Sequence, residues 1–148
     1  MAQRPRLRLV IDTMVVIRGA RALRQKPAEP ETPELQIIHG WVEEEGLFVW
    51  LYSQPILEEY RAVLQRLKVP RSAIGRFINL LIEGGIRIEA KEAGSFSPDP
   101  KDDPFYHCGI AGRADFIITD NIRDFPPIKG RKRPRIVTPS EATKILFE

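Results

Sequence analysis

Short apolar segments alternate with longer segments of helical periodicity along most of this chain. Five strands are predicted at residues 7–11, 47–52, 86–90, 116–119 and 136–137, and the segments around 35–42, 53–67, 71–83, 104–112 and 138–147 are predicted helices. Strands that follow one another through helices pair in parallel, and right-handed crossovers place those helices on the faces of the sheet. The alternation therefore predicts an α/β fold, a three-layer α/β/α arrangement around a central, mostly parallel sheet of about five strands.

Local signals mark the ends of several of these elements. Pro27, Pro30 and Pro33 predict a loop within residues 20–34, between two short helices. Ser53 is a good N-cap for the helix that follows it. The segment 138–141, Thr-Pro-Ser-Glu, has the spacing of a capping box and predicts the start of the last helix.

Length and composition restrict the class of protein. With 148 residues, 43% of them hydrophobic, residues 1–148 are expected to form a single domain. We expect a cytoplasmic protein with no membrane association, because there is neither an apolar run of roughly 20 residues nor a signal-peptide pattern. Cys108, His39 and His107 offer few zinc ligands and are expected to be packing or surface residues, so a bound metal would have oxygen ligands.

Acidic residues follow the predicted strands. Asp12 ends the first strand, Asp103 opens a helix, and Asp120, Asn121 and Asp124 follow the fourth strand. Ligands of parallel sheets bind beyond the carboxyl ends of the strands, so several of these side chains are expected to converge on one edge. Carboxylates brought together repel one another unless a cation lies among them, and hard oxygen ligands select Mg²⁺ or Mn²⁺.

Helix phase separates two adjacent glutamates of the predicted helix 53–67. At about 100° per residue, Glu59 lies roughly 95° from the centre of the apolar face and Glu58 roughly 165° from it. Glu59 is therefore predicted to border the core and Glu58 to face solvent. Without the other acids, Glu59 would be interpreted simply as a boundary charge.

Four segments in this order resemble the PIN-domain family, in particular its toxin-like (VapC-type) members in bacterial and archaeal toxin–antitoxin pairs. They are VIDT at residues 10–13, SQPILEEYRAVL at 53–64, DPKDDPFYHCGIA at 99–111 and IITDN at 117–121, closed by Asp124-Phe125. The resemblance implies that Asp12, Glu59 and Asp103 match the family's acids. Asn121 stands where members carry Asp or Asn, and Thr119 where they carry Ser or Thr.

The resemblance also implies an activity. It implies a Mg²⁺- or Mn²⁺-dependent endoribonuclease that cleaves single-stranded RNA and leaves a 5′-phosphate, with an antitoxin and a second copy of the chain as possible partners. In this interpretation Asp12 and Asp103 are the principal metal ligands, Glu59 is a ligand or orients water, Asn121 completes the site, and Asp120 or Asp124 supports it.

Basic residues could hold the phosphates of such a substrate. The chain is mildly basic, with a formal charge of +3 and a pI of about 9.2. Arg18 and Arg21 are spaced to share a helix face, and a basic run contains Lys129, Arg131, Lys132, Arg133 and Arg135. Such patches give salt-dependent attraction for nucleic acid, although a solvated loop is an equal interpretation of residues 129–135.

Several alternatives remain at the level of sequence. Asp103 before Pro104 also fits a helix cap, and Asp120 and Asp124 also fit a polar turn. The resembling family usually has Asn two residues after the first acid, where this chain has Met14, so an inactive or weakened protein that binds RNA or an antitoxin is an alternative function. A phosphoacceptor receiver or a haloacid-dehalogenase-like phosphatase fits less well, since Met14, Arg6 and Arg8 stand where those proteins need acids.

Overall fold

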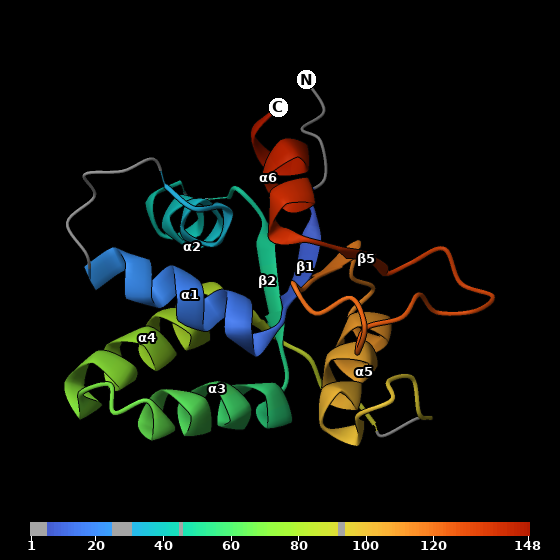
Figure 1. The fold of residues 1–148 in the computed structure, drawn as a ribbon, viewed down its shortest axis with the longest axis horizontal. Helices are drawn as coiled ribbons and strands as arrows, with labels where there is room; N and C mark the ends of the chain where they lie inside the picture. The colour runs from blue at the N-terminus through green and yellow to red at the C-terminus, as the bar shows by residue number, and fades with distance from the viewer. Residues whose placement is uncertain (1–5, 25–30, 45, 92–93) are drawn as a thin grey trace.

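The computed structural model describes residues 6–24, 31–44, 46–91 and 94–148. The expected loop around Pro27 and Pro30 lies outside these residues. These residues form five strands and six α-helices, with a 3₁₀ turn before the fifth helix. Figure 1 shows how the elements are arranged. The strands are β1 (Arg8–Ile11), β2 (Val49–Tyr52), β3 (Ile86–Arg87), β4 (Phe116–Ile118) and β5 (Arg135–Val137). The helices are α1 (Thr13–Arg24), α2 (Pro33–Glu43), α3 (Gln54–Arg66), α4 (Arg71–Gly84), the 3₁₀ turn η1 (Pro100–Asp102), α5 (Asp103–Ala111) and α6 (Pro139–Phe147).

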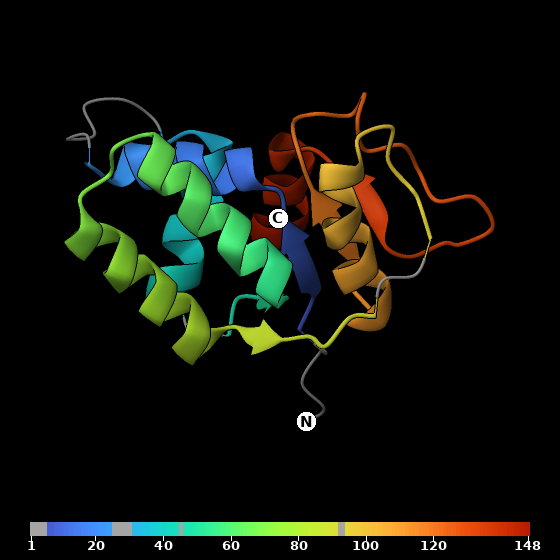
Figure 2. The same cartoon turned by 90° about the horizontal axis from the view of Figure 1, so that it is seen from below.

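All strand pairs in the sheet are parallel, and the strand order is β3-β2-β1-β4-β5. The crossovers from β1 to β2 and from β2 to β3 move in one direction along the sheet, and the crossover from β3 to β4 moves in the other. Right-handed crossovers therefore place α1–α4 on one face and α5 on the opposite face, as Figure 2 shows. The predicted three-layer fold is confirmed.

The direction of the crossovers reverses between β1 and β4, which are hydrogen-bonded neighbours. Ile11 pairs with Ile118 at the carboxyl ends of these two strands. In open parallel sheets such a reversal leaves a crevice beyond the strand ends. The residues that follow β1 and β4, beginning with Asp12 and Thr119, therefore share one edge of the sheet.

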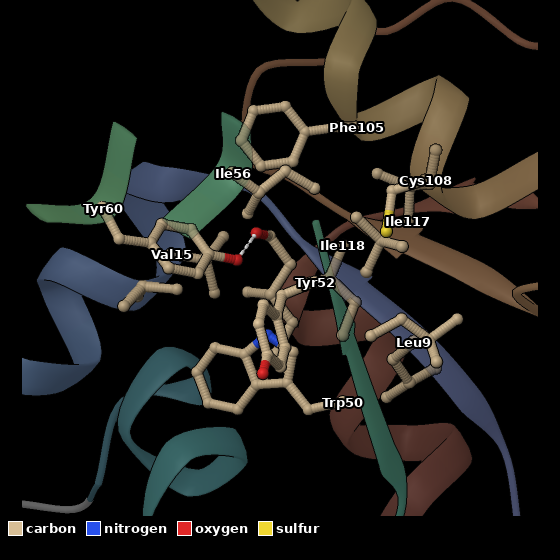
Figure 3. Packing of buried hydrophobic residues seen from close by; sticks show 14 of the residues in the cluster. Leu9, Val15, Trp50, Tyr52, Ile56, Tyr60, Phe105, Cys108, Ile117 and Ile118 are labelled. Carbon is tan, nitrogen blue, oxygen red and sulfur yellow. Dashed lines mark hydrogen bonds between the residues drawn. The ribbon is translucent and has the colours of Figure 1, made fainter. Parts of the chain in front are cut away.

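The core joins this edge to the helix α3. Leu9, Val10 and Ile11 of β1 are fully buried, as are Trp50 and Tyr60. The Tyr60 hydroxyl donates a hydrogen bond of 2.5 Å to the carbonyl of Ile11 (Figure 3). Burial raises the pKa of Tyr60 well above its ordinary value, so this hydroxyl stays protonated and remains a donor. Helix α3 is thus fastened to the last residue of β1.

Several elements differ in length from those predicted. Strand β3 has two exposed residues and ends at Arg87, short of the predicted residue 90. Helix α1 continues to Arg24, into the segment expected to be a loop. Ser53 occupies the N-cap of α3 as predicted, although its side chain makes no capping hydrogen bond. The capping box of Thr138 and Glu141 is confirmed, with both reciprocal hydrogen bonds present.

Candidate functional site

Asp12 is held in place by the neighbouring strand. Its backbone N–H donates to the carbonyl of Ile118 at 2.9 Å, and the Thr119 hydroxyl donates to Asp12 Oδ2 at 2.8 Å. Both side chains are buried, with 7% of Asp12 and none of Thr119 exposed. A buried carboxylate with a fixed donor on one oxygen has a defined orientation. Thr119 therefore orients Asp12.

Glu59 reaches the same edge from α3. The Thr13 hydroxyl, at the first residue of α1, donates a hydrogen bond to Glu59 Oε2. Glu59 is half-buried and Glu58 is exposed, which confirms the orientation predicted from helix phase. The adjacent Tyr60 fixes this turn of α3 against Ile11. Sequence reasoning missed Thr13 as a residue of the site, although a hydroxyl directly after Asp12 was the available signal.

Burial raises the pKa of Asp12 from 3.8 to about 6. Hydrogen bonds from Thr119 and from the Thr13 backbone oppose this rise, and the nearby charges of Glu59 and Asp120 add to it. An acid with this pKa is ionised near neutral pH but is destabilised in that form. A cation beside Asp12 would relieve both the burial cost and the repulsion.

Asp102 is a carboxylate that sequence reasoning did not select. It is half-buried, and its pKa is raised from 3.8 to about 7, first by burial and then by the negative charges of Asp12, Asp99, Glu59 and Asp124. The contributions of Asp12, which follows β1, and of Glu59 on α3 indicate that Asp102 lies near these two acids. The sequence favours the neighbouring Asp103 as a metal ligand, because Asp103 matches an acid of the resembling family and precedes Pro104.

Asp103 has a different set of partners. It is buried, and its Oδ1 accepts hydrogen bonds of 2.9 Å from the backbone N–H groups of Phe96 and Ser97. These contacts hold the loop that precedes η1. The alternative of a helix cap for Asp103 is wrong, because the residue at the N-cap of α5 is Asp102 and the Asp103 carboxylate is bonded to that loop. The role of Asp103 as a metal ligand stays a prediction.

The residues after β4 form a hydrogen-bonded polar turn. Asn121 donates through Nδ2 to Asp124 Oδ2 at 2.7 Å, and its backbone N–H donates to the Thr119 hydroxyl at 3.0 Å. Asp120 pairs with Arg18 of α1, with Arg18 Nη1 and Asp120 Oδ2 2.5 Å apart. The turn thus supports Thr119 from one side, and Arg18 places a positive charge beside the acids.

The acids at this edge fit a divalent cation chemically. The acids at this edge, Asp12, Glu59 and Asp102, offer only oxygen atoms, which suits Mg²⁺ or Mn²⁺. However, no set of three or more Asp, Glu, His or Cys side chains among the described residues lies close enough together to hold a metal ion as they stand. The raised pKa values of Asp12 and Asp102 are the observation that favours a cation here.

The other basic residues lie in different places. Arg21 lines an apolar groove between α1 and α4. Lys129, Arg131 and Lys132 are exposed on the connection between β4 and β5. Arg133 pairs with Asp115, which precedes β4 and therefore lies at the amino-terminal edge of the sheet. Binding of RNA by the basic run stays a prediction; because a parallel β4–β5 connection must return to the opposite edge, Arg133 lies away from the acids.

The histidines and the cysteine are packing or surface residues, as predicted. Cys108 is buried, and burial raises the pKa of its thiol to about 12. His39 lies between Glu31 and Glu43, and His107 Nε2 lies 2.8 Å from the carbonyl of Gly94. Helices long and apolar enough to cross a membrane are absent from the described part of the chain.

Comparison with known proteins gives one family. The family model described as PIN domain matches residues 8–123, a span that includes Asp12, Glu59, Asp102 and Thr119. A comparison with curated proteins finds no match.

Proposed function

Since this chain belongs to the PIN-domain family, whose members are generally metal-dependent nucleases, we propose that it hydrolyses phosphodiester bonds within single-stranded RNA. The observation that carries this proposal is the pair of acids held by threonines at one edge of the sheet. Thr119 orients Asp12 and Thr13 orients Glu59. A cation-dependent hydrolase needs carboxylates held in fixed positions to bind its metal ion. Here two carboxylates are fixed, and a third, Asp102, has a raised pKa.

We assign the third carboxylate to Asp102. Its pKa responds to Asp12 and Glu59, whereas one oxygen of Asp103 accepts two backbone N–H groups of a neighbouring loop. Asp103 then keeps η1 in place so that Asp102 faces the other acids. In this proposal Asn121 and Asp124 support Thr119 and do not bind the cation directly.

A bound Mg²⁺ or Mn²⁺ would lower the pKa of an attacking water and neutralise charge on the scissile phosphate. Asp12, Glu59 and Asp102 are the residues that would hold it. Thr13 occupies Oε2 of Glu59, so Oε1 is the oxygen through which Glu59 can accept a proton from water. Arg18, half-exposed beside Asp120, is positioned to contact a phosphate of the strand.

Cleavage of labelled single-stranded RNA in Mn²⁺ tests the proposal. We expect Asp12→Asn and Asp102→Asn to abolish cleavage, and Glu58→Gln, an exposed change on the same helix as Glu59, to leave it unchanged. Asp103→Asn is expected to lose stability, because a hydrogen bond to a charged acceptor is worth roughly 1.5–3 kcal/mol and one to the neutral amide oxygen that replaces it about 0.5–1.5 kcal/mol. Full activity of Asp102→Asn together with a folded, inactive Asp103→Asn would reverse the assignment of the third acid.

A weakened enzyme that binds RNA without turnover is the second candidate. Met14 lies on the first turn of α1, directly after Thr13, with 44% of its surface exposed. It offers no oxygen to support Asp12 or a cation. RNA binding by the wild-type protein in Mn²⁺ with no cleavage of any sequence tested would favour this candidate.

A toxin role would require an antitoxin, and one groove suits such a partner. The groove has a volume of about 760 Å³ and lies between α1, α2, α3 and α4. Its exposed apolar residues include Val42, Leu67 and Leu80, and its basic residues are Arg21, Lys68 and Arg76. Exposed apolar residues with cationic neighbours match an amphipathic helix with acidic flanks.

Expression of the chain tests the toxin role. We expect wild-type expression to stop cell growth and Asp12→Asn expression to permit it. Leu80→Lys is expected to leave RNA cleavage intact while it prevents neutralisation by a co-expressed antitoxin. Growth unaffected by an active wild-type enzyme would refute the toxin role. The homodimer stays a prediction, which light scattering can measure.

A further inference from the structure

Four arginines gather at the amino-terminal edge of the sheet, opposite the acids. Arg8 opens β1, Arg113 lies between α5 and β4, and Arg133 and Arg135 lie at the start of β5. We call these four residues the arginine edge. The arginine edge and the acids lie at opposite ends of the parallel strands. Along β4 they are separated by about four residues at ~3.3 Å each, or roughly 13 Å.

Asp115 organises the arginine edge. Its Oδ2 accepts the backbone N–H of Arg8 at 2.8 Å, and its Oδ1 lies 3.4 Å from Nη1 of Arg133. Its carbonyl accepts the N–H of Arg135 at 3.0 Å, and its own N–H donates to the carbonyl of Arg8 at 2.7 Å. Asp115 thus fixes the chain around three arginines from two distant segments, two through its carboxylate and one through its backbone carbonyl. The four arginines of this edge outnumber this one acid.

The guanidinium groups are positioned but still accessible. Arg8 donates through Nε to the carbonyl of Gly112 at 2.9 Å, and the Arg135 guanidinium lies 5.6 Å from the centre of the Phe116 ring. The Arg133 side chain is 75% exposed. Among the ion pairs of the described residues, Arg133 with Asp115 is the only pair that involves this edge. Their remaining N–H groups suit bidentate binding of phosphate oxygens.

A basic path connects the arginine edge to the acids. The connection from β4 to β5 begins beside Asp12 at Thr119 and ends at Arg135, and it extends outward from the sheet (Figure 1). Besides Arg133, it carries four exposed cations, Arg123, Lys129, Arg131 and Lys132. After Asp124, the connection contains no acidic residue up to Arg135. Beyond Asp124, a polyanion that leaves the acidic site would meet only basic charged residues along this route.

We infer that the arginine edge binds the phosphates of the same RNA strand whose scissile bond lies at the acids. This inference rests on the proposed nuclease function and gives it a substrate class: single strands long enough to reach both edges of the sheet. An anionic membrane is the less suitable partner, because membrane-binding surfaces combine cations with apolar anchors. Ile122 is the only exposed large apolar side chain in residues 113–135.

Binding of fluorescent oligouridines in EDTA tests this inference without any turnover. Oligomers of about 4 and about 16 nucleotides bracket the site sizes of single-strand grooves. The Arg133→Ala/Arg135→Ala double variant is compared with Arg66→Ala/Arg71→Ala, which removes the same charge from exposed positions at the turn between α3 and α4. The variant Arg133→Lys/Arg135→Lys keeps the charge and separates the effect of charge from that of lost structure. Thermal melting shows whether each variant is folded.

The expected result is a change in salt dependence. Loss of two phosphate contacts lowers the slope of log K against log salt by about 1.4, so the deficit in affinity is about sevenfold larger at ~50 mM than at ~200 mM salt. We expect this deficit for the long oligomer and not for the short one. The lysine variant should keep the wild-type slope, and the control pair should bind as the wild type does.

Equal binding of the long oligomer by the alanine variant and the control pair would overturn the inference. A deficit seen only with phosphatidylserine vesicles would overturn it as well and assign the edge to a membrane. The two proposals fail separately. A wild-type protein that cleaves RNA while the alanine variant binds normally refutes the inference alone, and a wild-type protein that never cleaves while the variant loses its salt slope refutes only the nuclease function.

Discussion

Replacing Asp12 with asparagine should stabilise the metal-free protein at neutral pH. The pKa of this acid is about 6 in the folded chain against an ordinary value of 3.8. Between pH 3.8 and about 6, Asp12 is therefore protonated in the folded state but ionised in the unfolded state. The free energy of unfolding falls as the pH rises through this range. Above pH 6 the full cost, about 3 kcal/mol at 1.36 kcal/mol per pKa unit, is present. Asparagine carries no charge, so the variant does not have this cost of burying an ionised carboxylate.

Urea unfolding in EDTA at several pH values measures this effect. Near pH 4 the Asp12 carboxyl is largely neutral, so Asp12→Asn and the wild type should be similarly stable. At pH 8 the variant should be more stable by up to about 3 kcal/mol, or roughly 6–12 °C in melting temperature. The Thr119 hydroxyl can still donate to the amide oxygen, so its hydrogen bond survives the change.

Added Mn²⁺ should reverse the difference. A cation that binds only the folded wild type stabilises it in proportion to the logarithm of its concentration over the dissociation constant. Glu58→Gln, exposed on α3, serves as the control and should give the same small difference at every pH. A variant that is less stable than the wild type at pH 8 in EDTA would refute the burial argument, as would a stability gap that is equally large at pH 4.

Three other changes test how the site is held. Tyr60→Phe leaves the buried carbonyl of Ile11 without its donor, so we expect a loss of about 1–3 kcal/mol in urea unfolding and a fall in activity; unchanged stability would show that the hydrogen bond is dispensable. Thr119→Val removes a hydrogen bond that lowers the pKa of Asp12, so the acid limb of the pH–rate profile should move to higher pH, and a move in the other direction would contradict the assigned role. Met14→Asn adds an oxygen beside Asp12 and should raise Mn²⁺ affinity, up to about tenfold, measured by calorimetry; weaker binding would count against support from this position.

The sequence was sufficient for the parts of the fold that follow from periodicity. Alternation of apolar and amphipathic segments predicted the parallel sheet, and helix phase distinguished Glu59 from Glu58. Both arguments use a regular repeat of the backbone, which local sequence determines. The lengths of β3 and α1 were predicted less well, because burial in the sheet and contacts with other helices decide where an element ends.

Asp102, the third acid in our proposal, could not be found in the same way. Residues Pro100–Asp102 form a 3₁₀ turn, which does not keep the rotation of an α-helix, so phase along α5 does not extend back to Asp102. The partners of Asp103 are backbone groups at residues 96 and 97, whose position the sequence does not reveal. The sequence also does not show at which edge of the sheet Arg133 lies, because that position depends on the path of the connection between β4 and β5.

The hydrogen bond from Thr119 to Asp12 spans 107 residues of sequence. During synthesis, Asp12 emerges early and stays without its donor until β4 has left the ribosome and paired with β1. An incomplete chain therefore contains Asp12 but lacks the hydroxyl that orients it. Under the proposed ribonuclease function, the site gains its full geometry only after most of the message has been translated, so we expect a nascent chain to spare the message to which it is still attached.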